Sequence, residues 1–336
     1  MKNYKKTRSR APLRLGLAGG GTDIEAFYSL HGGRVLNATI SMYANCSIVL
    51  NDNDQFEALD LKIVEQGSTA SDLILHKEAL NYFREVNKHR IDPSRKLKIT
   101  TWCDAPIGSG VGSSSAIVVS ILAALYYFNK IVITSNELAR QAYKIERKRL
   151  NLAGGYQDQI AAAYGGMNWI EFQKERFQVH RIGLHDDIFR ELESSILLYY
   201  CGVSRSSAKV IEDQITNISM NKNKSLKKIL LDSVQIKSAL VEGDFDKFYN
   251  LMSRAWESKK NSSKFVAGPK IKEIEDILNE NGVRAFKLSG AGGGGFMTIY
   301  VNPEDKVKIV DLLSQLDGKF FPFSFSNNGV ESWYAC

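Results

Sequence analysis

The sequence predicts an α+β fold of two domains, an N-terminal domain of residues 1–180 and a C-terminal domain of residues 181–336. Segments with the alternation of strands are interspersed with segments that have the apolar periodicity of helices. A chain of 336 residues, 44% of them hydrophobic, is long enough to bury the cores of one or two domains. Three glycine-rich loops interrupt this succession of strands and helices. The sequence contains no internal repeat and no low-complexity linker.

The N-terminal half predicts a sheet that delivers the chain into two of these loops. In chain order we expect a strand at 14–17, a helix near 24–30, one or two strands in 35–52, a helix around 72–88 and a strand at 97–106. A buried helix at 114–129 follows, because this segment is apolar almost all round. Thr134 and Glu137 form a T-x-x-E capping box that opens the next helix, which we expect to run to Leu150. A short helix between the glycine pairs 154–155 and 165–166 and a strand from Met167 complete the half.

In the C-terminal half, the order of strands and helices predicts the architecture of the domain. A strand at 194–202 is followed by helical segments in 204–260 and at 269–282, strands at 283–289 and 296–301, a helix at 303–316 and a strand at 320–325. If the helical segments between the strands at 194–202 and 283–289 are counted as one helical connection, this order is the split βαβ pattern of ferredoxin-like domains.

Charge and cysteine content exclude several classes of protein. The formal charge is +7 and the pI about 9.0, which favours anionic ligands, but the basic residues are scattered and form no stripe with interleaved aromatics, so we expect no nucleic-acid partner. The four cysteines stand far apart without C-x-x-C spacing, which favours a reducing compartment. We find no signal peptide, and the longest apolar run, 116–128, is too short to cross a bilayer. We therefore expect a cytoplasmic protein with no membrane partner.

The second glycine loop, DAPIGSGVGSSSA at 104–116, has the composition of a phosphate-binding loop without its lysine. Gly108, Gly110 and Gly112 allow the backbone to wrap a phosphate chain. The following serines occupy the first turn of a helix, where unpaired N–H groups and the helix dipole favour negative charge. Their hydroxyls add donors and one candidate Mg²⁺ ligand.

The first and third loops are less specific. LAGGGTD, 17–23, presents backbone N–H groups before a helix. This pattern is equally compatible with an anion-binding loop and with an ordinary tight turn. LSGAGGGGF, 288–296, satisfies G-x-G-x-x-G formally, but it lies between two strands, which excludes a dinucleotide site of the usual strand-loop-helix kind. The P-loop, nucleophile-elbow and H-E-x-x-H motifs are absent.

The three loops in this order resemble the three motifs of the GHMP kinase superfamily, and the resemblance covers essentially the whole chain. It implies an N-terminal domain like ribosomal protein S5 domain 2, a ferredoxin-like C-terminal domain, and ATP and Mg²⁺ as cofactors. The second motif, 105–116, would hold the triphosphate through backbone amides and the helix N-terminus. The implied ATP-binding residues are Pro106, Gly108, Ser109, Gly110, Val111, Gly112, Ser113, Ser114 and Ser115.

The resemblance also assigns the catalytic residues. Asp158 would be the general base and Arg14 its cationic neighbour, while Ser114 and Glu146 would be Mg²⁺ ligands. The alternatives for these residues are that Glu146 is a surface charge paired with Lys144 or Arg149, that Asp158 caps a helix, and that Arg14 is an exposed arginine at a sheet edge.

Substrate residues follow from the first motif, where this chain has glycines in place of the bulky residues of galactokinases. AGGGTD and CGVSRSSAKV are similar to the D-glycero-D-manno-heptose 7-phosphate kinases, a branch that phosphorylates the anomeric hydroxyl for surface polysaccharide synthesis. The expected substrate-binding residues are Gly19, Gly20, Gly21, Thr22, Asp23, Arg205, Ser206, Ser207, Gly290, Gly292 and Gly293. The stretch around Arg205 suits a capped surface helix equally well. A fucokinase-like enzyme acting on a free sugar and a non-catalytic ligand-binding member are the alternatives, and a homodimer is left open.

Overall fold

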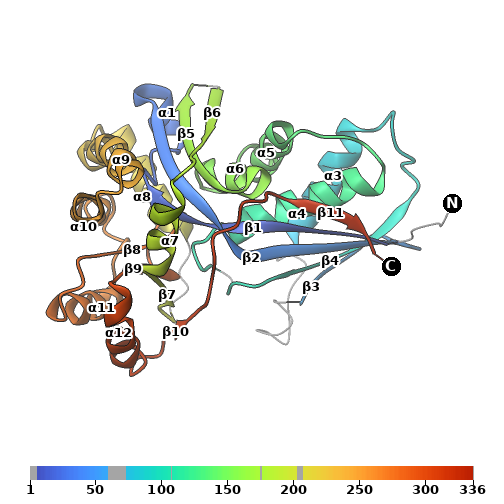
Figure 1. Ribbon diagram of the computed structural model, residues 1–336. Coiled ribbons are helices and arrows are strands. Elements are labelled where there is room, and N and C mark those ends of the chain that lie inside the picture. Colours follow the sequence, from blue (N-terminus) through green and yellow to red (C-terminus); the bar gives the residue numbers. More distant parts are fainter. Residues whose placement is uncertain (1–5, 60–72, 107, 175, 203–206, 336) are drawn as a thin grey trace.

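The computed structural model describes residues 6–59, 73–106, 108–174, 176–202 and 207–335. Two sheets define two layered domains that meet side by side, with the elements of the C-terminal half gathered at one end of the larger sheet (Figure 1). This confirms the predicted α+β class.

The larger sheet has seven strands, and its spine is the order β11-β1-β2-β4-β3, with β5 and β6 continuing from the far end of β2. The strands are β1 (Lys6–Ala18), β2 (Gly33–Asn51), β3 (Gln55–Ala58), β4 (Lys96–Cys103), β5 (Met167–Gln173), β6 (Arg176–Arg181) and β11 (Glu331–Tyr334). All pairs are antiparallel except β3 with β4. β2 is one long strand of 19 residues that bends across the sheet and pairs with β4 at one end and β5 at the other.

Helices cover one face of this sheet (Figure 1). They are α3 (Ile74–Val86), α4 (Ser113–Phe128), α5 (Ser135–Tyr143) and α6 (Gln157–Tyr164), while α1 (Glu25–His31) lies near the end of β1. α4 is the central one, buried almost all round as its sequence predicts, and it contributes much of the apolar core together with the inward residues of β1, β2 and β4. α5 begins where the capping box predicts, because the Thr134 hydroxyl accepts a hydrogen bond from the backbone N–H of Glu137 at 3.2 Å.

The predicted helix around residues 135–150 changes type midway. α5 ends at Tyr143 and the chain continues as a six-residue π-helix, η1 (Lys144–Arg149). π-helical turns are rare and widen the helix by one residue per turn, which rotates the side chains that follow. Glu146 lies in this turn.

The smaller sheet has the order β10-β7-β9-β8, all antiparallel, which is the ferredoxin-like order expected from the sequence. Its strands are β7 (Ile196–Tyr200), β8 (Ala285–Leu288), β9 (Phe296–Tyr300) and β10 (Lys319–Phe320). The helices of this half are α7 (Asp186–Ser194), α8 (Ser207–Ser219), α9 (Lys224–Glu242), α10 (Phe245–Lys260), α11 (Pro269–Glu280), η2 (Pro303–Asp305) and α12 (Lys306–Leu313). Among the described helices, none is long and apolar enough to cross a membrane.

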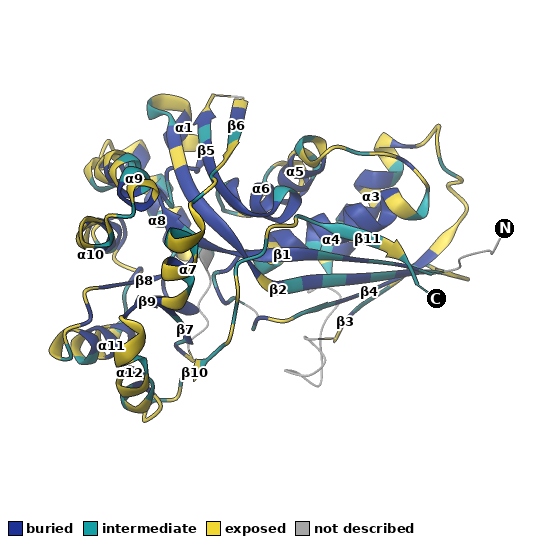
Figure 2. Ribbon diagram, in the orientation of Figure 1, coloured by how far each residue is buried: buried dark blue, intermediate teal, exposed yellow. Residues whose placement is uncertain are grey.

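An apolar interface joins the two halves. Side chains from the end of the larger sheet, such as Leu17, Leu36 and Trp169, share one buried cluster with Phe248 and Tyr300 of the C-terminal half. Figure 2 shows this continuity as dark ribbon running from β1 and β2 into the elements around β8 and β9. The interface fixes the position of the first glycine loop, which begins where β1 ends.

The C-terminal segment differs from the prediction. Lys319 and Phe320 pair with β7, and the Phe321 N–H still donates to Leu198 O at 2.9 Å, but the strand predicted over residues 320–325 does not continue beyond this point in the smaller sheet. The chain instead crosses back to the N-terminal half, where Phe325 bridges Ile40 and β11 pairs with β1 (Figure 1). Pro322 has no N–H to donate to a sheet, which explains why the predicted strand stops. The boundary near residue 180 stays a prediction.

Candidate active site

The second glycine loop and α4 form a cradle of backbone N–H groups. Gly108, Gly110 and Gly112 all have positive φ, between 72° and 82°, so the loop takes a course that other residues rarely adopt. Gly112 is the N-cap of α4, and no side chain caps this end of the helix. The N–H groups of the first turn, Ser113 to Ser115, therefore remain available to an anion.

The third loop packs against the second and holds it in shape. The backbone N–H of Phe296 donates to Ser109 O at 2.8 Å, and Gly110 and Gly290 approach so closely that a Cβ on either would overlap the other loop. Gly290 lines the cavity described below, but Gly292 packs on Val266 and the N–H of Gly293 donates to Val266 O. Gly292 and Gly293 are thus outside the lining of the cavity and hold the loop against Val266 of the C-terminal half, so their contact with substrate stays a prediction.

Asp158 and Arg14 form a close ion pair beside this cradle. Asp158 Oδ1 accepts hydrogen bonds from Arg14 Nε at 2.7 Å and Nη2 at 2.5 Å, while Arg14 Nη1 donates to Gly110 O at 2.7 Å. The Arg14 side chain is only 4% exposed and that of Asp158 is 23% exposed. At Arg14, β1 pairs with β2 on one side, and on the other the Arg14 backbone N–H donates to Val111 O of the second loop at 3.0 Å, so Arg14 is no exposed sheet-edge residue. The pair therefore links the carboxylate directly to the phosphate cradle.

Asp23 caps the helix that carries Asp158. Its carboxylate accepts from the backbone N–H groups of Tyr156 and Gln157, from the side-chain amide of Gln157 and from the N–H of Gly21. Gly155 leaves the space that this carboxylate occupies, because a Cβ there would overlap Asp23 Oδ2. The alternative in which Asp158 itself caps α6 is wrong, since the cap comes from the first glycine loop. Asp23 still borders the cavity, as does Gly21.

Two other residues of the first loop face away from the cavity. Thr22 is fully buried, and its hydroxyl contacts Gly19 O and both backbone polar groups of Arg34. A Cβ at Gly19 would overlap the carbonyl of Arg34. The contacts of Gly19 and Thr22 fold the loop against β2 and neither residue lines the cavity, so their binding of substrate stays a prediction. Gly20 keeps open space on its Cβ side, with only Gln157 Nε2 near, at 3.9 Å.

Glu146 is buried, not a surface charge. Its side chain is 1% exposed, with Oε1 accepting from the Ser114 hydroxyl at 3.3 Å and Oε2 from Gln159 Nε2 at 2.5 Å. Gln159 Nε2 also donates to Ser115 Oγ, and its own Oε1 is buried without a partner in the described part of the chain. A carboxylate, a hydroxyl and an unpaired amide oxygen are oxygen ligands that suit Mg²⁺, which needs only one or two carboxylates. The described residues contain no cluster of three histidine, cysteine or acidic side chains that would hold a metal by themselves.

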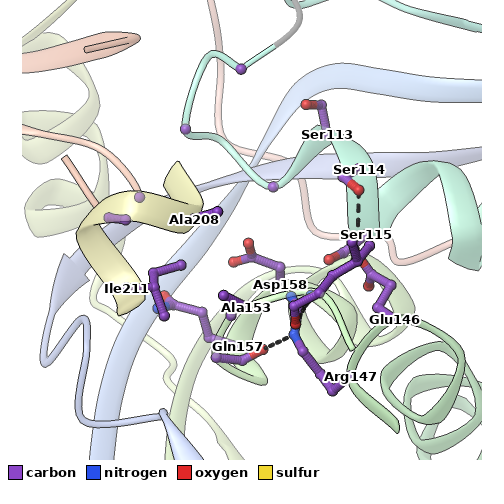
Figure 3. A pocket seen from close by; sticks show the side chains of 18 of the residues that line it. Ser113, Ser114, Ser115, Glu146, Arg147, Ala153, Gln157, Asp158, Ala208 and Ile211 are labelled. Carbon is purple, nitrogen blue, oxygen red and sulfur yellow. Dashed lines mark hydrogen bonds and ion pairs between the residues drawn. The ribbon is translucent and has the colours of Figure 1, made fainter. Parts of the chain in front are cut away.

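These groups line one cavity of about 410 Å³ (Figure 3). Its walls include Ser113, Ser114, Glu146 and Asp158 on one side and Ala208, Ile211 and Gln214 of α8 on the other, together with Gly154 and Gly155. Pro106, Ser109 and Val111 support the loop from outside the lining; Ser109 and Val111 are fully buried. Arg205 and Ser206 lie outside the described residues, and Ser207 begins α8.

Several polar residues that contact or line this site were not predicted from the sequence. Lys259 of α10 donates to the carbonyls of Gly290 and Leu288, and burial lowers its pKa to about 7. Lys287 of β8 donates to Gly16 O at 2.6 Å and Leu17 O at 3.3 Å, and burial sets its pKa well below the ordinary value. A lysine within a short apolar strand, as in AFKL, was the one available signal. Arg147 and Gln159 follow the predicted Glu146 and Asp158 by one residue each.

A nucleotide-type phosphate cradle, a paired aspartate and a buried carboxylate beside serine hydroxyls define a small-molecule kinase. The chain matches the model of the GHMP kinases N terminal domain over residues 74–166 and that of the GHMP kinases C terminal over residues 236–315. It is 33% identical to a D-glycero-alpha-D-manno-heptose 7-phosphate kinase of Campylobacter jejuni, over 98% of this chain and 99% of that protein. The protein belongs to the GHMP kinase family and is a sugar kinase of that family; the family uses ATP as its phosphate donor.

Solved structures agree with this assignment. The crystal structure of a D-glycero-D-manno-heptose 1-phosphate kinase from Bacteroides thetaiotaomicron superposes with a TM-score of 0.80 at 35% identity, covering 98% of this chain and 99% of that one. A galactokinase from Lactococcus lactis shares the fold, with a TM-score of 0.75 at 16% identity, covering 97% of this chain and 95% of that one. A second sequence relative, an L-fucokinase/L-fucose-1-P guanylyltransferase of Bacteroides fragilis, is 25% identical over 91% of this chain, which spans 36% of that longer protein.

Proposed function

We propose that the protein transfers the γ-phosphoryl group of ATP to the anomeric hydroxyl of D-glycero-D-manno-heptose 7-phosphate, giving the 1,7-bisphosphate and ADP. The observation that carries the chemistry is the position of Asp158, whose carboxyl carbon lies 3.3 Å from where a Cβ on Gly112 would stand. A group transferred from a phosphate chain in the loop therefore lies next to the carboxylate. The acceptor hydroxyl then has a base within reach of the group that it attacks.

In this mechanism the oxygen of the sugar hydroxyl bonds to the γ-phosphorus while Asp158 Oδ2 accepts the hydroxyl proton. The bond between the γ-phosphorus and the oxygen that bridges it to the β-phosphate breaks, and ADP leaves. Arg14 holds Oδ1 through Nε and Nη2, which fixes the orientation of the carboxylate and directs Oδ2 to the acceptor hydroxyl. An anomeric hydroxyl is more acidic than an ordinary alcohol, so one carboxylate is an adequate base.

The loop amides and α4 offset the charge of the phosphate chain. Ser114 and Glu146 would hold Mg²⁺, which supplies charge neutralisation at the β- and γ-phosphates. Gln159 positions Glu146 and Ser115 through one amide nitrogen. This arrangement accounts for a phosphate loop that has no lysine.

The choice of acceptor rests on the Campylobacter relative and on the open first loop. Gly20 has open space on its Cβ side and Gly21 adds no side chain to the cavity that it lines, and this suits a large sugar that already carries phosphate. Arg205 and Ser206, with the start of α8, remain our candidates for that second phosphate. The product would feed nucleotide-activated heptose for a surface polysaccharide, in a cytoplasmic enzyme whose oligomeric state is open to a homodimer.

Activity should be measured as ADP release with Mg-ATP and either heptose 7-phosphate or the same heptose without phosphate. Activity confined to the phosphorylated sugar supports the proposal. Equal activity with both sugars would favour a free-sugar kinase, the alternative that the similarity to the fucokinase supports. If ADP is released with neither sugar as substrate, the heptose assignment is overturned.

A further inference from the structure

Arg147 is a cavity residue that the mechanism above does not use. It follows Glu146 in the π-helix η1 and lines the same cavity as Ser114 and Asp158, with 12% of its side chain exposed (Figure 3). Its guanidinium Nη1 lies 3.7 Å from Glu146 Oε1, the oxygen that also accepts from the Ser114 hydroxyl. The cation therefore stands beside the oxygen set to which we assign Mg²⁺.

The backbone of the glycine pair fixes the direction of this guanidinium. Arg147 Nε donates to Gly155 O at 3.2 Å and Nη1 to Leu152 O at 3.5 Å. The guanidinium lies flat on Gly154, where a Cβ would overlap both Cζ and Nη2. The absence of a side chain at Gly154 thus leaves space for the guanidinium, and the two carbonyl contacts engage Nε and Nη1.

The third guanidinium nitrogen, Nη2, has no acceptor. Among the described residues, none accepts a hydrogen bond from it. A guanidinium carries five N–H donors, so Nη2 keeps donors for an oxygen of a ligand in the cavity. Arg14, the other arginine of the cavity, has its donors committed to Asp158 and Gly110.

We propose that Arg147 binds an oxygen of the transferred γ-phosphoryl group through Nη2 and stabilises the charge that builds up there during transfer. The inference rests on the proposed function in taking ATP as donor, but it does not depend on which sugar is the acceptor. The Arg147 guanidinium lies beside Glu146 and Ser114, and this position favours the transferred γ-phosphoryl group as its ligand over a phosphate carried by the sugar. An arginine aimed at planar phosphoryl oxygens is well matched in geometry and charge.

The test is equilibrium binding of ADP and of the non-hydrolysable analogue AMP-PNP, each in the presence of MgCl₂, by calorimetry. Only AMP-PNP carries a γ-phosphoryl group, so the ratio of the two dissociation constants isolates the contact. We expect Arg147→Gln to weaken AMP-PNP binding on the order of 10- to 100-fold and to leave ADP binding within about twofold. Lys148→Gln, which removes the neighbouring cation of the same π-helix on the exposed side, should leave both constants unchanged.

Three results would overturn the proposal. Equal weakening of ADP and AMP-PNP would show that Arg147 only supports the glycine pair. No change in either constant would show that it makes no contact with the nucleotide. A loss confined to binding of heptose 7-phosphate would place the guanidinium on the acceptor instead.

If Arg147→Gln does not fold, the same ratio is measured in Arg147→Lys, whose single ammonium cannot both keep the Gly155 carbonyl and reach the cavity. A reduced preference for AMP-PNP supports the proposal, and an unchanged preference overturns it. Failure of the wild-type protein to bind heptose 7-phosphate would refute the sugar assignment alone, because the nucleotide comparison needs no sugar.

Discussion

Replacing Asp158 by asparagine removes the proposed base while preserving the shape of the side chain. The amide oxygen still accepts from Arg14 Nε, so the arginine keeps that contact and its bond to Gly110 O. The asparagine cannot take the proton of the acceptor. General-base catalysis contributes on the order of 10²–10⁴-fold, and we expect kcat to fall by about that factor while the affinity for AMP-PNP stays within about threefold.

The change also weakens a partly buried ion pair. Breaking a fully buried pair costs roughly 3–5 kcal/mol. Asp158 is 23% exposed and the asparagine retains one hydrogen bond, so we expect a smaller loss of unfolding free energy, about 1–2 kcal/mol. Stability is measured by urea unfolding and kcat by ADP release on the same preparations.

A matched control separates the two effects. Asp232 forms an ion pair with Arg254 at 2.5 Å, its side chain is 4% exposed, and it lies outside the cavity. Asp232→Asn should therefore cost comparable stability and leave kcat unchanged. An Asp158→Asn enzyme that retains more than about a tenth of wild-type kcat would refute the role of Asp158, as would an equal loss of kcat in Asp232→Asn.

Three further changes test the surroundings of this base. Glu146→Gln should raise the Mg²⁺ concentration needed for half-maximal activity about tenfold or more, because the buried carboxylate loses its charge; an unchanged Mg²⁺ titration would remove Glu146 from the metal site. Gly155→Ala should lower the unfolding free energy by ~1–3 kcal/mol and reduce kcat, because the new methyl overlaps Asp23; Gly183→Ala, with no atom near its Cβ side, is the control, and equal stability of the two variants would contradict the packing argument. Burial lowers the pKa of Lys259 to about 7, so the folded protein binds fewer protons than the unfolded chain between pH 7 and 10 and stability should rise with pH there, by at most ~1.4 kcal/mol per unit for this group; Lys259→Met should flatten the pH dependence of the urea midpoint, and identical slopes in both proteins would show that Lys259 titrates normally.

Local signals in the sequence were sufficient for the architecture. The order of strands and helices in the C-terminal half fixed the ferredoxin-like sheet, because its strands are short, apolar and separated by clear helices. The phosphate cradle was also readable, since alternating glycines before an apolar helix have few structural uses other than a tight loop at a helix N-terminus. β11 was missed because its residues, ESWY, are only half-buried and pair with a strand more than 300 positions away in sequence.

The site was predictable as a set of residues, but less so as a set of contacts. The structure brings Arg14, Asp158, Glu146 and Ser114 to one cavity, as expected. Asp23 was expected to bind substrate; it borders the cavity, and three of its four hydrogen bonds also organise the start of α6. Such a cap between distant segments leaves no trace in local sequence. The direction of Arg147 depends on the π-helical turn, which no periodicity indicated, and on the bare backbone of Gly154.

Transfer to the anomeric hydroxyl is tested most directly by the ³¹P NMR spectrum of the product formed from ATP and heptose 7-phosphate. We expect one new phosphomonoester signal that is split by the anomeric proton, beside the retained signal of the 7-phosphate. Phosphorylation of another hydroxyl, seen as coupling to a non-anomeric proton, would contradict a sugar 1-kinase. Release of inorganic phosphate with no new sugar phosphate would contradict transfer to this sugar altogether.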